Sequence, residues 1–249
     1  MQIACFDTAF HAHMPDVARR LALPGRFVRA GVQRYGFHGL SCEHTMSVLG
    51  ADAPARIVIA HLGNGASLTA VKNGVSIDTT MGFTPTGGIP MGTRTGDLDP
   101  GVVVYMMRHE KLSADALEHV VDRESGLGAI GGTPDVKTLL ERAPTDANAR
   151  AAIETFTYAI RKTVGAFAAA LEGLDLVVFT GGIGEHAPEI RSLACSGLEV
   201  LGIRLDDARN RGGEDDISAE DSGCAVRIIA ADEAHVIARH VLALCAERG

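Results

Sequence analysis

Apolar and polar residues follow a period of about two in several short segments of the chain, which is typical of β-strands. Three such segments are consecutive: 56–62 is an apolar, β-branched run, 66–71 alternates, and 75–79 follows the hairpin dipeptide Asn73-Gly74. They predict an antiparallel meander. Shorter apolar runs predict further strands, at residues 3–6, 174–180 and 226–230.

Helical spacing is clearest at residues 148–172, where apolar residues recur at steps of three and four positions. These residues form one apolar stripe, which predicts a helix that packs in the core and has no catalytic or binding role. They are Ile153, Phe156, Ile160, Val164, Phe167 and Leu171. Caps and spacing predict further helices, at 41–49, 99–109, 113–122, 133–142, 188–197 and 232–248. The polar, acidic segment 206–224 is expected to be a surface loop or hairpin. Strands and helices together predict an α/β protein.

Composition narrows the class of protein. The 249 residues are 46% hydrophobic and 22% charged, which suits a globular core in one large domain or two small ones. An aromatic content of 4% without Trp disfavours a stacking platform for single-stranded nucleic acid. A net charge of −8 and the lack of a basic run disfavour nucleic acid and acidic membrane surfaces as partners.

Cysteine usage and hydropathy bear on location. The five cysteines include no Cys-x-x-Cys pair, so neither a disulfide framework nor a zinc site is predicted. The sequence shows no signal-peptide pattern and no apolar run long enough to cross a membrane. We therefore expect a protein of the reducing cytoplasm.

The turn after the first strand of the meander is unusually polar. Gly63-Asn64-Gly65 can aim several backbone N–H groups at a phosphate, although the two glycines also suit a plain turn. Arg94 lies among glycines in segment 91–97, just before the helix start at Asp99-Pro100. Packing explains an arginine there poorly, whereas bidentate contact with phosphate or carboxylate explains it well.

A second glycine pattern also suggests a nucleotide. The strand at 174–180 runs into GGIGEH at 181–186 and then a helix, although the spacing is not that of the Rossmann fingerprint. The glycine-rich loop 126–132 precedes a helix expected to open at Thr133-Pro134-Asp135. That loop is either simple punctuation or part of a helix N-terminus that faces a nucleotide.

Three polar positions leave two interpretations open. Asp7 follows a strand end, where catalytic or metal-linked carboxylates often lie, but it could instead cap a short helix. His38 is bracketed by glycines that allow close approach to a ligand, yet a lone histidine is more often structural. Asp232-Glu233 could bind Mg²⁺ through water or cap the last helix.

Motifs in fixed order carry a resemblance to a known family. They are FDTAFH (6–11), RYGFHG (34–39), HLGNGAS (61–67), MGFTPTGGIPMGTRTGDLDP (81–100), FTGGIGEH (179–186) and the region around Glu233. Over essentially its whole length the chain resembles the acetate kinases of the acetokinase family, within the actin/Hsp70/sugar-kinase superfold. The resemblance implies an actin-like ATPase (ribonuclease H-like) domain, with a mixed sheet flanked by helices.

The resemblance also implies roles for individual residues. Asp7 matches a catalytic aspartate, Arg94 an arginine that engages the phosphoryl group and the acetate carboxylate, and His38 a histidine that stabilises the transition state. Glu233 matches a glutamate associated with Mg²⁺. The implied phosphate-binding turn and adenosine-binding segments are His61, Leu62, Gly63, Asn64 and Gly65, then Asp135, Val136 and Lys137, then Gly182, Ile183, Gly184, Glu185 and His186.

The implied reaction is the reversible transfer of the ATP γ-phosphoryl group to acetate, giving ADP and acetyl phosphate, in a homodimer with Mg²⁺ or Mn²⁺. Acetate is already ionised at neutral pH and needs no general base. We therefore expect Asp7 to hold Mg²⁺ or its waters and not to abstract a proton. A noncatalytic nucleotide-binding or dimerisation fragment, and a propionate or butyrate kinase, remain alternatives.

Two features depart from the family pattern. His186 stands where the family usually has Asn, and Asp232-Glu233-Ala234 where it has Asn-Glu-Glu. The chain also begins where the second half of the family begins, so that it looks truncated at the N-terminus. On this basis we expect 1–12 to be a remnant of an N-terminal domain and interdomain strand, 13–231 the nucleotide-binding domain, and 232–249 a helix that packs on the missing domain. We also expect weak or no activity from the chain alone.

Overall fold

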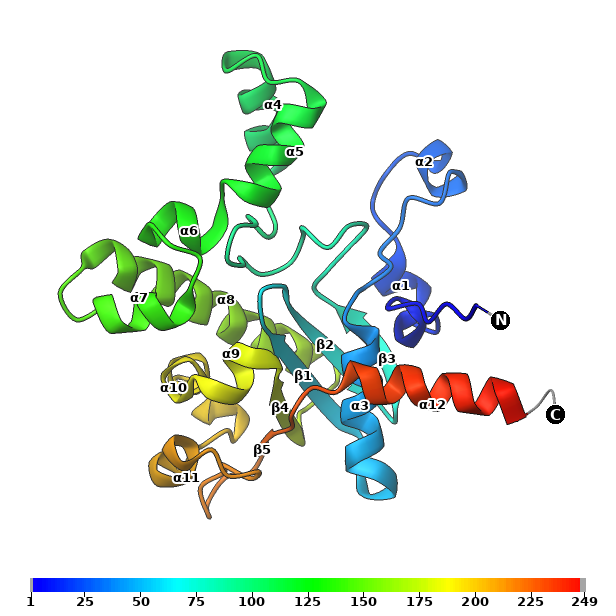
Figure 1. Ribbon diagram of the computed structural model, residues 1–249, viewed down its shortest axis with the longest axis vertical. Coiled ribbons are helices and arrows are strands. Elements are labelled where there is room, and N and C mark those ends of the chain that lie inside the picture. The colour runs from blue at the N-terminus through cyan, green and yellow to red at the C-terminus, as the bar shows by residue number, and fades with distance from the viewer. Residues whose placement is uncertain (1, 247–249) are drawn as a thin grey trace.

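The computed structural model describes residues 2–246, which fold around a five-stranded mixed sheet (Figure 1). The order across the sheet is β3-β2-β1-β4-β5. β1 pairs antiparallel with β2, and β2 with β3, whereas β4 is parallel to both β1 and β5. The predicted meander is thus confirmed. The bounds are β1 (Arg56–Leu62), β2 (Ala66–Lys72), β3 (Val75–Thr79), β4 (Leu176–Thr180) and β5 (Ala225–Ile228).

The turn between β2 and β3 has the conformation that its sequence predicts. Asn73 and Gly74 have φ angles of 51° and 78°. Both residues therefore lie in the left-handed region, where Asn and Gly are tolerated better than other residues, and the strands can close with their natural twist.

Helices cover both faces of the sheet (Figure 1). α3 and α12 lie together on one side, while α8 crosses the other side and carries α6, α7 and α10 against it. The helices are α1 (Asp16–Arg19), α2 (Gly25–Arg29), α3 (Gly39–Leu49), α4 (Pro100–His109), α5 (Ala114–Arg123), α6 (Gly126–Gly131), α7 (Val136–Arg142), α8 (Ala147–Ala170), α9 (Gly181–His186), α10 (Pro188–Cys195), α11 (Asp207–Gly212) and α12 (Glu233–Ala246).

The alternation of side chains along β1 divides the core into two layers. Val58, Ala60 and Leu62 join the larger cluster with α8, and Ile57 and Ile59 join the smaller cluster with α3. The predicted apolar stripe of α8 is fully buried in the larger layer, which confirms its assignment to the core. The hairpin of α4 and α5 differs, since neither helix has a buried residue, and it projects from the body.

The predicted strand at residues 3–6 is wrong. Residues 2–6 have no regular secondary structure, and Phe6 is 70% exposed. An apolar run becomes a strand only when a neighbouring strand pairs with its backbone groups, and none of the five described strands does so here.

The glycine-rich segments predicted as loops are helical. Residues 126–132 contain α6, and residues 181–186 form α9 directly at the end of β4. α7 begins two residues later than predicted, because Asp135 and not Thr133 is its N-cap. The segment 206–224, expected to be a loop or hairpin, contains α11 and isolated bridges. The high glycine content of 126–132 and 181–186 had indicated loops, but both segments contain short helices that pack against the rest of the protein.

The last helix packs against α3. Arg239 donates to Glu43 at 2.6 Å and to Ser47 at 2.7 Å, and His240 lies 2.7 Å from the same glutamate. Leu242 on this helix is 70% exposed. The predicted end near Arg248 lies outside the described residues, and the division of the chain at residues 12 and 231 stays a prediction.

Candidate functional site

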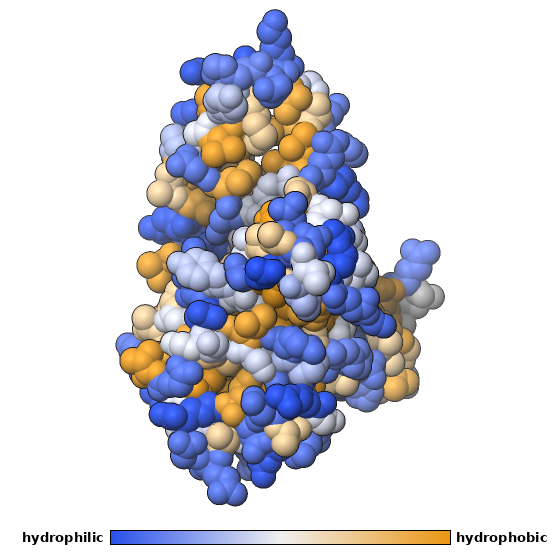
Figure 2. All heavy atoms as spheres, turned by 90° about the vertical axis from the view of Figure 1, so that its left-hand side faces the viewer, coloured by the Kyte–Doolittle hydropathy of each residue, from blue (hydrophilic) through white to orange (hydrophobic). Residues whose placement is uncertain are grey.

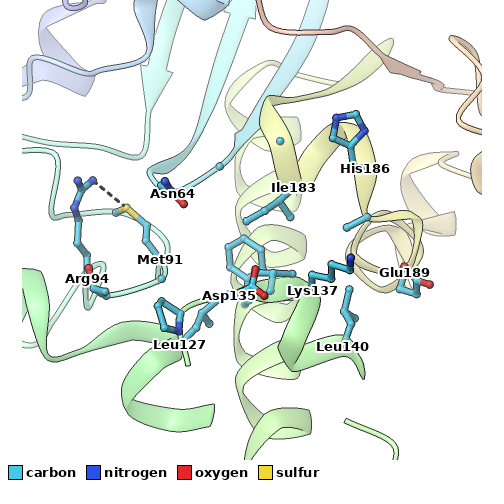
Figure 3. Close-up of a pocket in the computed structure, with 18 of the residues that line it drawn as sticks. Asn64, Met91, Arg94, Leu127, Asp135, Lys137, Leu140, Ile183, His186 and Glu189 are labelled. Atoms are coloured by element: carbon cyan, nitrogen blue, oxygen red, sulfur yellow. Dashed lines mark hydrogen bonds between the residues drawn. The ribbon is translucent and has the colours of Figure 1, made fainter. Parts of the chain in front are cut away.

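A cavity of about 1090 Å³ lies beyond the carboxyl ends of β1 and β4, between α9 and the helices α6, α7 and α8 (Figure 3). Residues singled out from the sequence line it, namely Gly63, Asn64, Arg94, Asp135, Val136, Lys137, Gly182, Ile183 and His186. The other lining residues had no catalytic or binding role assigned, and they are Met91, Gly92, Thr93, Arg123, Leu127, Pro134, Leu140, Glu141, Phe156, Ala187 and Glu189. A volume of this size suits a nucleotide.

Sheet register brings the two glycine motifs together. His61 pairs with Thr180, so that β1 and β4 end side by side and their following segments leave from the same edge. Gly181 has a φ of 77°, and a Cβ there would lie 2.8 Å from the carbonyl oxygen of Leu62. The two segments are therefore packed backbone to backbone, which only glycine allows.

The start of α7 supplies the opposite wall. The Asp135 carboxylate caps this helix and accepts hydrogen bonds from the backbone N–H of Thr138 at 3.0 Å and from its hydroxyl at 2.5 Å. These bonds lower the pKa of Asp135. The carboxylate is thus engaged within the protein, while Lys137 extends along the cavity in Figure 3.

A second group of predicted residues adjoins the cavity, around Asp7 and His38. The Asp7 carboxylate accepts from the backbone N–H of His38 at 2.6 Å and of Leu40 at 3.2 Å. His38 has a φ of 58° and is the N-cap of α3. Asp7 is therefore a cap, one of the two interpretations left open, but for a helix that starts some thirty residues later in the chain. It holds His38 in a left-handed conformation.

The two histidine rings of the site are stacked. Their centroids are 4.2 Å apart with an interplanar angle of 22°. Nδ1 of His38 shares a hydrogen bond with the hydroxyl of Ser67 at 2.9 Å, and Nδ1 of His61 with that of Ser41 at 2.8 Å. Burial first, and then His61, lower the pKa of His38 to about 3. The ring is therefore neutral and can act as a hydrogen-bond donor but not as a cation.

Gly65 is the point where this pair meets the arginine. A Cβ on Gly65 would lie 2.9 Å from Nε2 of His38 and 3.4 Å from Nη1 of Arg94. Nη1 of Arg94 is also 3.3 Å from the carbonyl oxygen of Pro85 and 3.5 Å from the sulfur of Met91. A ligand group beside this turn can therefore be contacted from both sides.

Glu233 lies near Asp7. Burial, and secondly the Asp7 charge, raise the pKa of Glu233. Glu185 accepts from the backbone N–H of Ala231 at 3.0 Å and so ties α9 to the start of α12. Among residues 2–246 no three His, Cys, Asp or Glu side chains are grouped to hold a metal. A pair of carboxylates nevertheless fits Mg²⁺, which commonly takes one or two of them and completes its shell with waters and substrate phosphates.

Some predicted residues are not part of the lining of the cavity. Leu62 is fully buried in the larger core layer, and Gly184 packs against Phe179 and the carbonyl oxygen of Ala60. Asp7, His38, His61, Gly65, Glu185 and Glu233 do not line the cavity either. Phe156 shows the reverse case, because it was assigned to the core and also forms part of the cavity wall.

Arg191 is a residue that the sequence did not indicate. It is 1% exposed and makes no ion pair in the part of the chain that is described. Its guanidinium donates to the carbonyl oxygens of Gly184 and Glu185, at 2.8 and 2.9 Å, which closes the C-terminal end of α9. It also donates to Asn210, at 2.7 Å to both the side-chain and backbone oxygens. A charged residue on the buried face of α10 was the available signal.

The mixed sheet, with helices on both faces and a cavity at the carboxyl ends of two parallel strands, defines an actin-like ATPase-type fold. Residues 1–239 match the Acetokinase family. The chain therefore belongs to that family.

Several relatives are similar over nearly the whole chain. An acetate kinase of Methylocella silvestris is 47% identical over 98% of this chain and 61% of its own length. An acetate kinase of Rhodopseudomonas palustris is 50% identical over 96% of this chain and 62% of its own length. The chain thus spans about three-fifths of the length of these relatives.

Solved structures agree. The crystal structure of Porphyromonas gingivalis acetate kinase has a TM-score of 0.91 at 39% identity, covering 96% of this chain and 63% of that one. A propionate kinase from Francisella tularensis has a TM-score of 0.89 at 37% identity, covering 94% and 62%. None of the helices within residues 2–246 has the length and apolar character that crossing a membrane requires.

Proposed function

We propose that the chain acts in the reversible, Mg²⁺-dependent transfer of the ATP γ-phosphoryl group to acetate, giving acetyl phosphate. The observation that carries the proposal is the single cavity onto which Asn64, Ile183 and Arg94 converge from separate segments. The Acetokinase match and the names of the relatives support the same reaction.

In this proposal the nucleotide lies between α9 and α7. Gly182, Ile183 and His186 contact it on one side, and Val136 and Lys137 on the other. The Gly63 N–H donates to the carbonyl oxygen of Gly65 within the turn, at 3.0 Å, so the N–H groups of Asn64 and Gly65 are the ones that would contact the phosphates. The phosphates then point to Arg94, at the end of the cavity nearest to His38.

The transfer depends on position and on neutralisation of charge. Arg94 binds the moving phosphoryl group. In the tautomer that we propose, the Ser67 hydroxyl donates its hydrogen to Nδ1 of His38, 2.9 Å away, so that Nε2 carries a hydrogen and can donate it to the same group as a neutral imidazole. Acetate is already a carboxylate and needs no base, so Asp7 abstracts no proton.

Asp7 and Glu233 would hold Mg²⁺ together with phosphate oxygens and waters. When bound, the ion neutralises charge on the β- and γ-phosphates. Both Asp7 oxygens already accept N–H groups from the start of α3, so the orientation of the carboxylate would be fixed before the ion binds.

The experiment measures acetyl phosphate formation by hydroxamate detection, beside ATP-analogue binding, in the 249-residue chain. Turnover with acetate supports the proposal, and Arg94→Ala should lower the rate on the order of 10³-fold. Absence of both binding and turnover contradicts it.

Two alternatives have observations in their favour. Binding without turnover would identify a catalytically impaired nucleotide-binding or dimerisation fragment, a function favoured by the three-fifths coverage of the relatives. Faster turnover of propionate or butyrate than of acetate would identify a paralogue, a function favoured by the similarity to a propionate kinase.

We further propose that the partner is a second copy of the chain, docked through α4. This helix projects from the body and exposes Val102, Val104, Tyr105 and Met107, each by more than two-fifths. Figure 2 shows apolar residues on the upper part of the molecule, where α4 and α5 lie. Tyr105→Glu should lower the mass measured by light scattering to that of a monomer, while Val200→Glu, at an exposed site elsewhere, should not. An unchanged mass for Tyr105→Glu would exclude α4 as the interface.

We also propose that the protein acts in the reducing cytoplasm, because its five cysteines include no Cys-x-x-Cys pair.

A further inference from the structure

The backbone of the loop that carries Arg94 is held by residues 121–128, which we call the α5–α6 connection. The loop and the connection exchange backbone hydrogen bonds in both directions. Thr95 donates to Val121 at 3.0 Å, Ser125 to Thr93 at 3.1 Å, Leu127 to Met91 at 2.9 Å and Gly128 to Gly92 at 2.8 Å. Within the loop, Met91 donates to the carbonyl oxygen of Arg94 at 3.0 Å. The position of the Arg94 backbone is therefore set by hydrogen bonds between its loop and the α5–α6 connection.

Gly126 lies at the closest point of this contact. Its φ is 67°, and a Cβ there would be 2.1 Å from the carbonyl oxygen of Met91. The same Cβ would be 2.7 Å from the carbonyl oxygen of Arg94 and 2.9 Å from its backbone nitrogen. All three neighbours are main-chain atoms, which cannot rotate aside as a flexible side chain could. A side chain at this position must therefore push the Arg94 loop away.

We infer that Gly126 is a positioning residue for Arg94, acting through the backbone of its loop; this rests on the proposed function, in which Arg94 binds the transferring phosphoryl group. Contact with a phosphoryl group is sensitive to displacements of roughly 1 Å. The guanidinium already lies beside Gly65 and Nε2 of His38, so the loop has little freedom to recover the contact from a shifted position.

Gly132, at the other end of α6, provides a matched control. Its φ is 79°, so an alanine there carries a similar backbone strain. A Cβ on Gly132, however, would meet only the far end of the Arg142 side chain, at 3.9 Å. Both Gly126→Ala and Gly132→Ala thus place an alanine at a positive φ, but only Gly126→Ala places a Cβ against the backbone of the Arg94 loop.

The test measures dissociation constants of ATP and AMP by calorimetry for the wild-type chain, Arg94→Ala, Gly126→Ala, Gly132→Ala and the Arg94→Ala/Gly126→Ala double variant. Because Arg94 would donate charged hydrogen bonds to the terminal phosphate, which AMP lacks, we expect Arg94→Ala to weaken ATP binding roughly tenfold or more and to leave AMP binding nearly unchanged. We expect Gly126→Ala to reproduce this selective loss and Gly132→Ala to keep the wild-type ratio of the two constants. The double variant should bind ATP no more weakly than Arg94→Ala.

The outcomes separate the two ideas. If Arg94→Ala loses ATP affinity but Gly126→Ala does not, or if the two losses add in the double variant, the positioning role is overturned and the proposed function stands. If Arg94→Ala binds ATP as tightly as the wild type, Arg94 makes no phosphate contact and both ideas fall.

A second pair of variants covers the case in which Gly126→Ala does not fold. The Thr93 hydroxyl donates to the carbonyl oxygen of Asp122 at 2.8 Å, so it joins the same loop to the same connection. Thr93→Val removes this bond at nearly constant volume, and Thr93→Ser keeps it. Because Thr93 also lines the cavity, the two variants are compared with each other. We expect the ratio of the ATP to the AMP dissociation constant to be larger for Thr93→Val than for Thr93→Ser; equal ratios for both would contradict the inference.

Discussion

Replacement of Arg191 by methionine should destabilise the chain and weaken nucleotide binding together. Methionine fills much of the volume of the arginine stem but leaves the carbonyl oxygens of Gly184, Glu185 and Asn210 without their donor. The arginine is 1% exposed, so water cannot simply replace the guanidinium. Two of these oxygens close α9, the helix that presents Gly182, Ile183 and His186 to the cavity.

The magnitude follows from the number of bonds lost. A hydrogen bond to a charged group contributes about 1.5–3 kcal/mol, and a buried acceptor left unsatisfied costs about 1–3 kcal/mol. Such contributions overlap, and the desolvation cost of the buried cation is relieved, so we expect a net loss of about 3–5 kcal/mol. For a chain of this size, that loss lowers the melting temperature by roughly 6–20 °C.

The assay is thermal unfolding followed by circular dichroism, with ATP binding measured by calorimetry well below the transition. Arg211→Met is the control, because the Arg211 side chain is 77% exposed and lies 3.7 Å from Asp207 in a surface pair. That change should cost less than about 0.5 kcal/mol. Arg191→Lys should recover only part of the loss, since one ammonium cannot replace the planar guanidinium fork. The reasoning would be refuted if Arg191→Met melted within about 2 °C of the control and bound ATP with unchanged affinity.

Three further predictions concern titratable groups. Asp7→Asn can keep only one of the two hydrogen bonds that cap α3, because its amide has a single acceptor oxygen, and it lacks the charge for Mg²⁺; its rate should recover partly at high Mg²⁺, whereas Asp7→Ala should lose both bonds and melt lower still. A defect in Asp7→Asn that no Mg²⁺ level alters would count against metal binding. The His38 ring, whose pKa is lowered by burial first and also by His61, Arg94 and His11 and raised by Asp7, should titrate in NMR spectra near pH 3. A midpoint near its ordinary value of about 6.5 would contradict its burial. Burial also lowers the pKa of His11 in the folded chain, so the unfolded chain binds a proton at this residue at higher pH than the folded chain does. The unfolding free energy should therefore fall as pH drops below about 6.5. His11→Asn should make this pH dependence less steep, and an unchanged slope would show that His11 does not contribute.

Local sequence determined the elements whose pattern is periodic and whose neighbours are close in the chain. The meander and its Asn73-Gly74 turn were predicted because alternation and turn chemistry are local. The buried stripe of α8 was predicted because a long helix shows its period many times. Capping residues such as Asp99 and Ser113 were correctly identified, since a cap acts within a few residues.

Tertiary structure decided whatever depends on a distant partner. Residues 3–6 are not a strand, because pairing needs a neighbour that the run itself does not specify. The glycine-rich segments at 126 and 181 are helices, and each begins with a glycine of positive φ that is packed on the backbone of another segment, a contact that the local sequence does not specify.

The candidate site divides in the same way. Sequence motifs supplied residues such as Asn64, Arg94 and Ile183, because short glycine-rich motifs keep their chemistry in adjacent positions. Only the folded chain made Asp7 the cap of α3, lowered the pKa of His38 by burial and brought Arg191 beneath α9. Burial and long-range hydrogen bonds govern these three results, and neither is a property of a residue's neighbours in sequence.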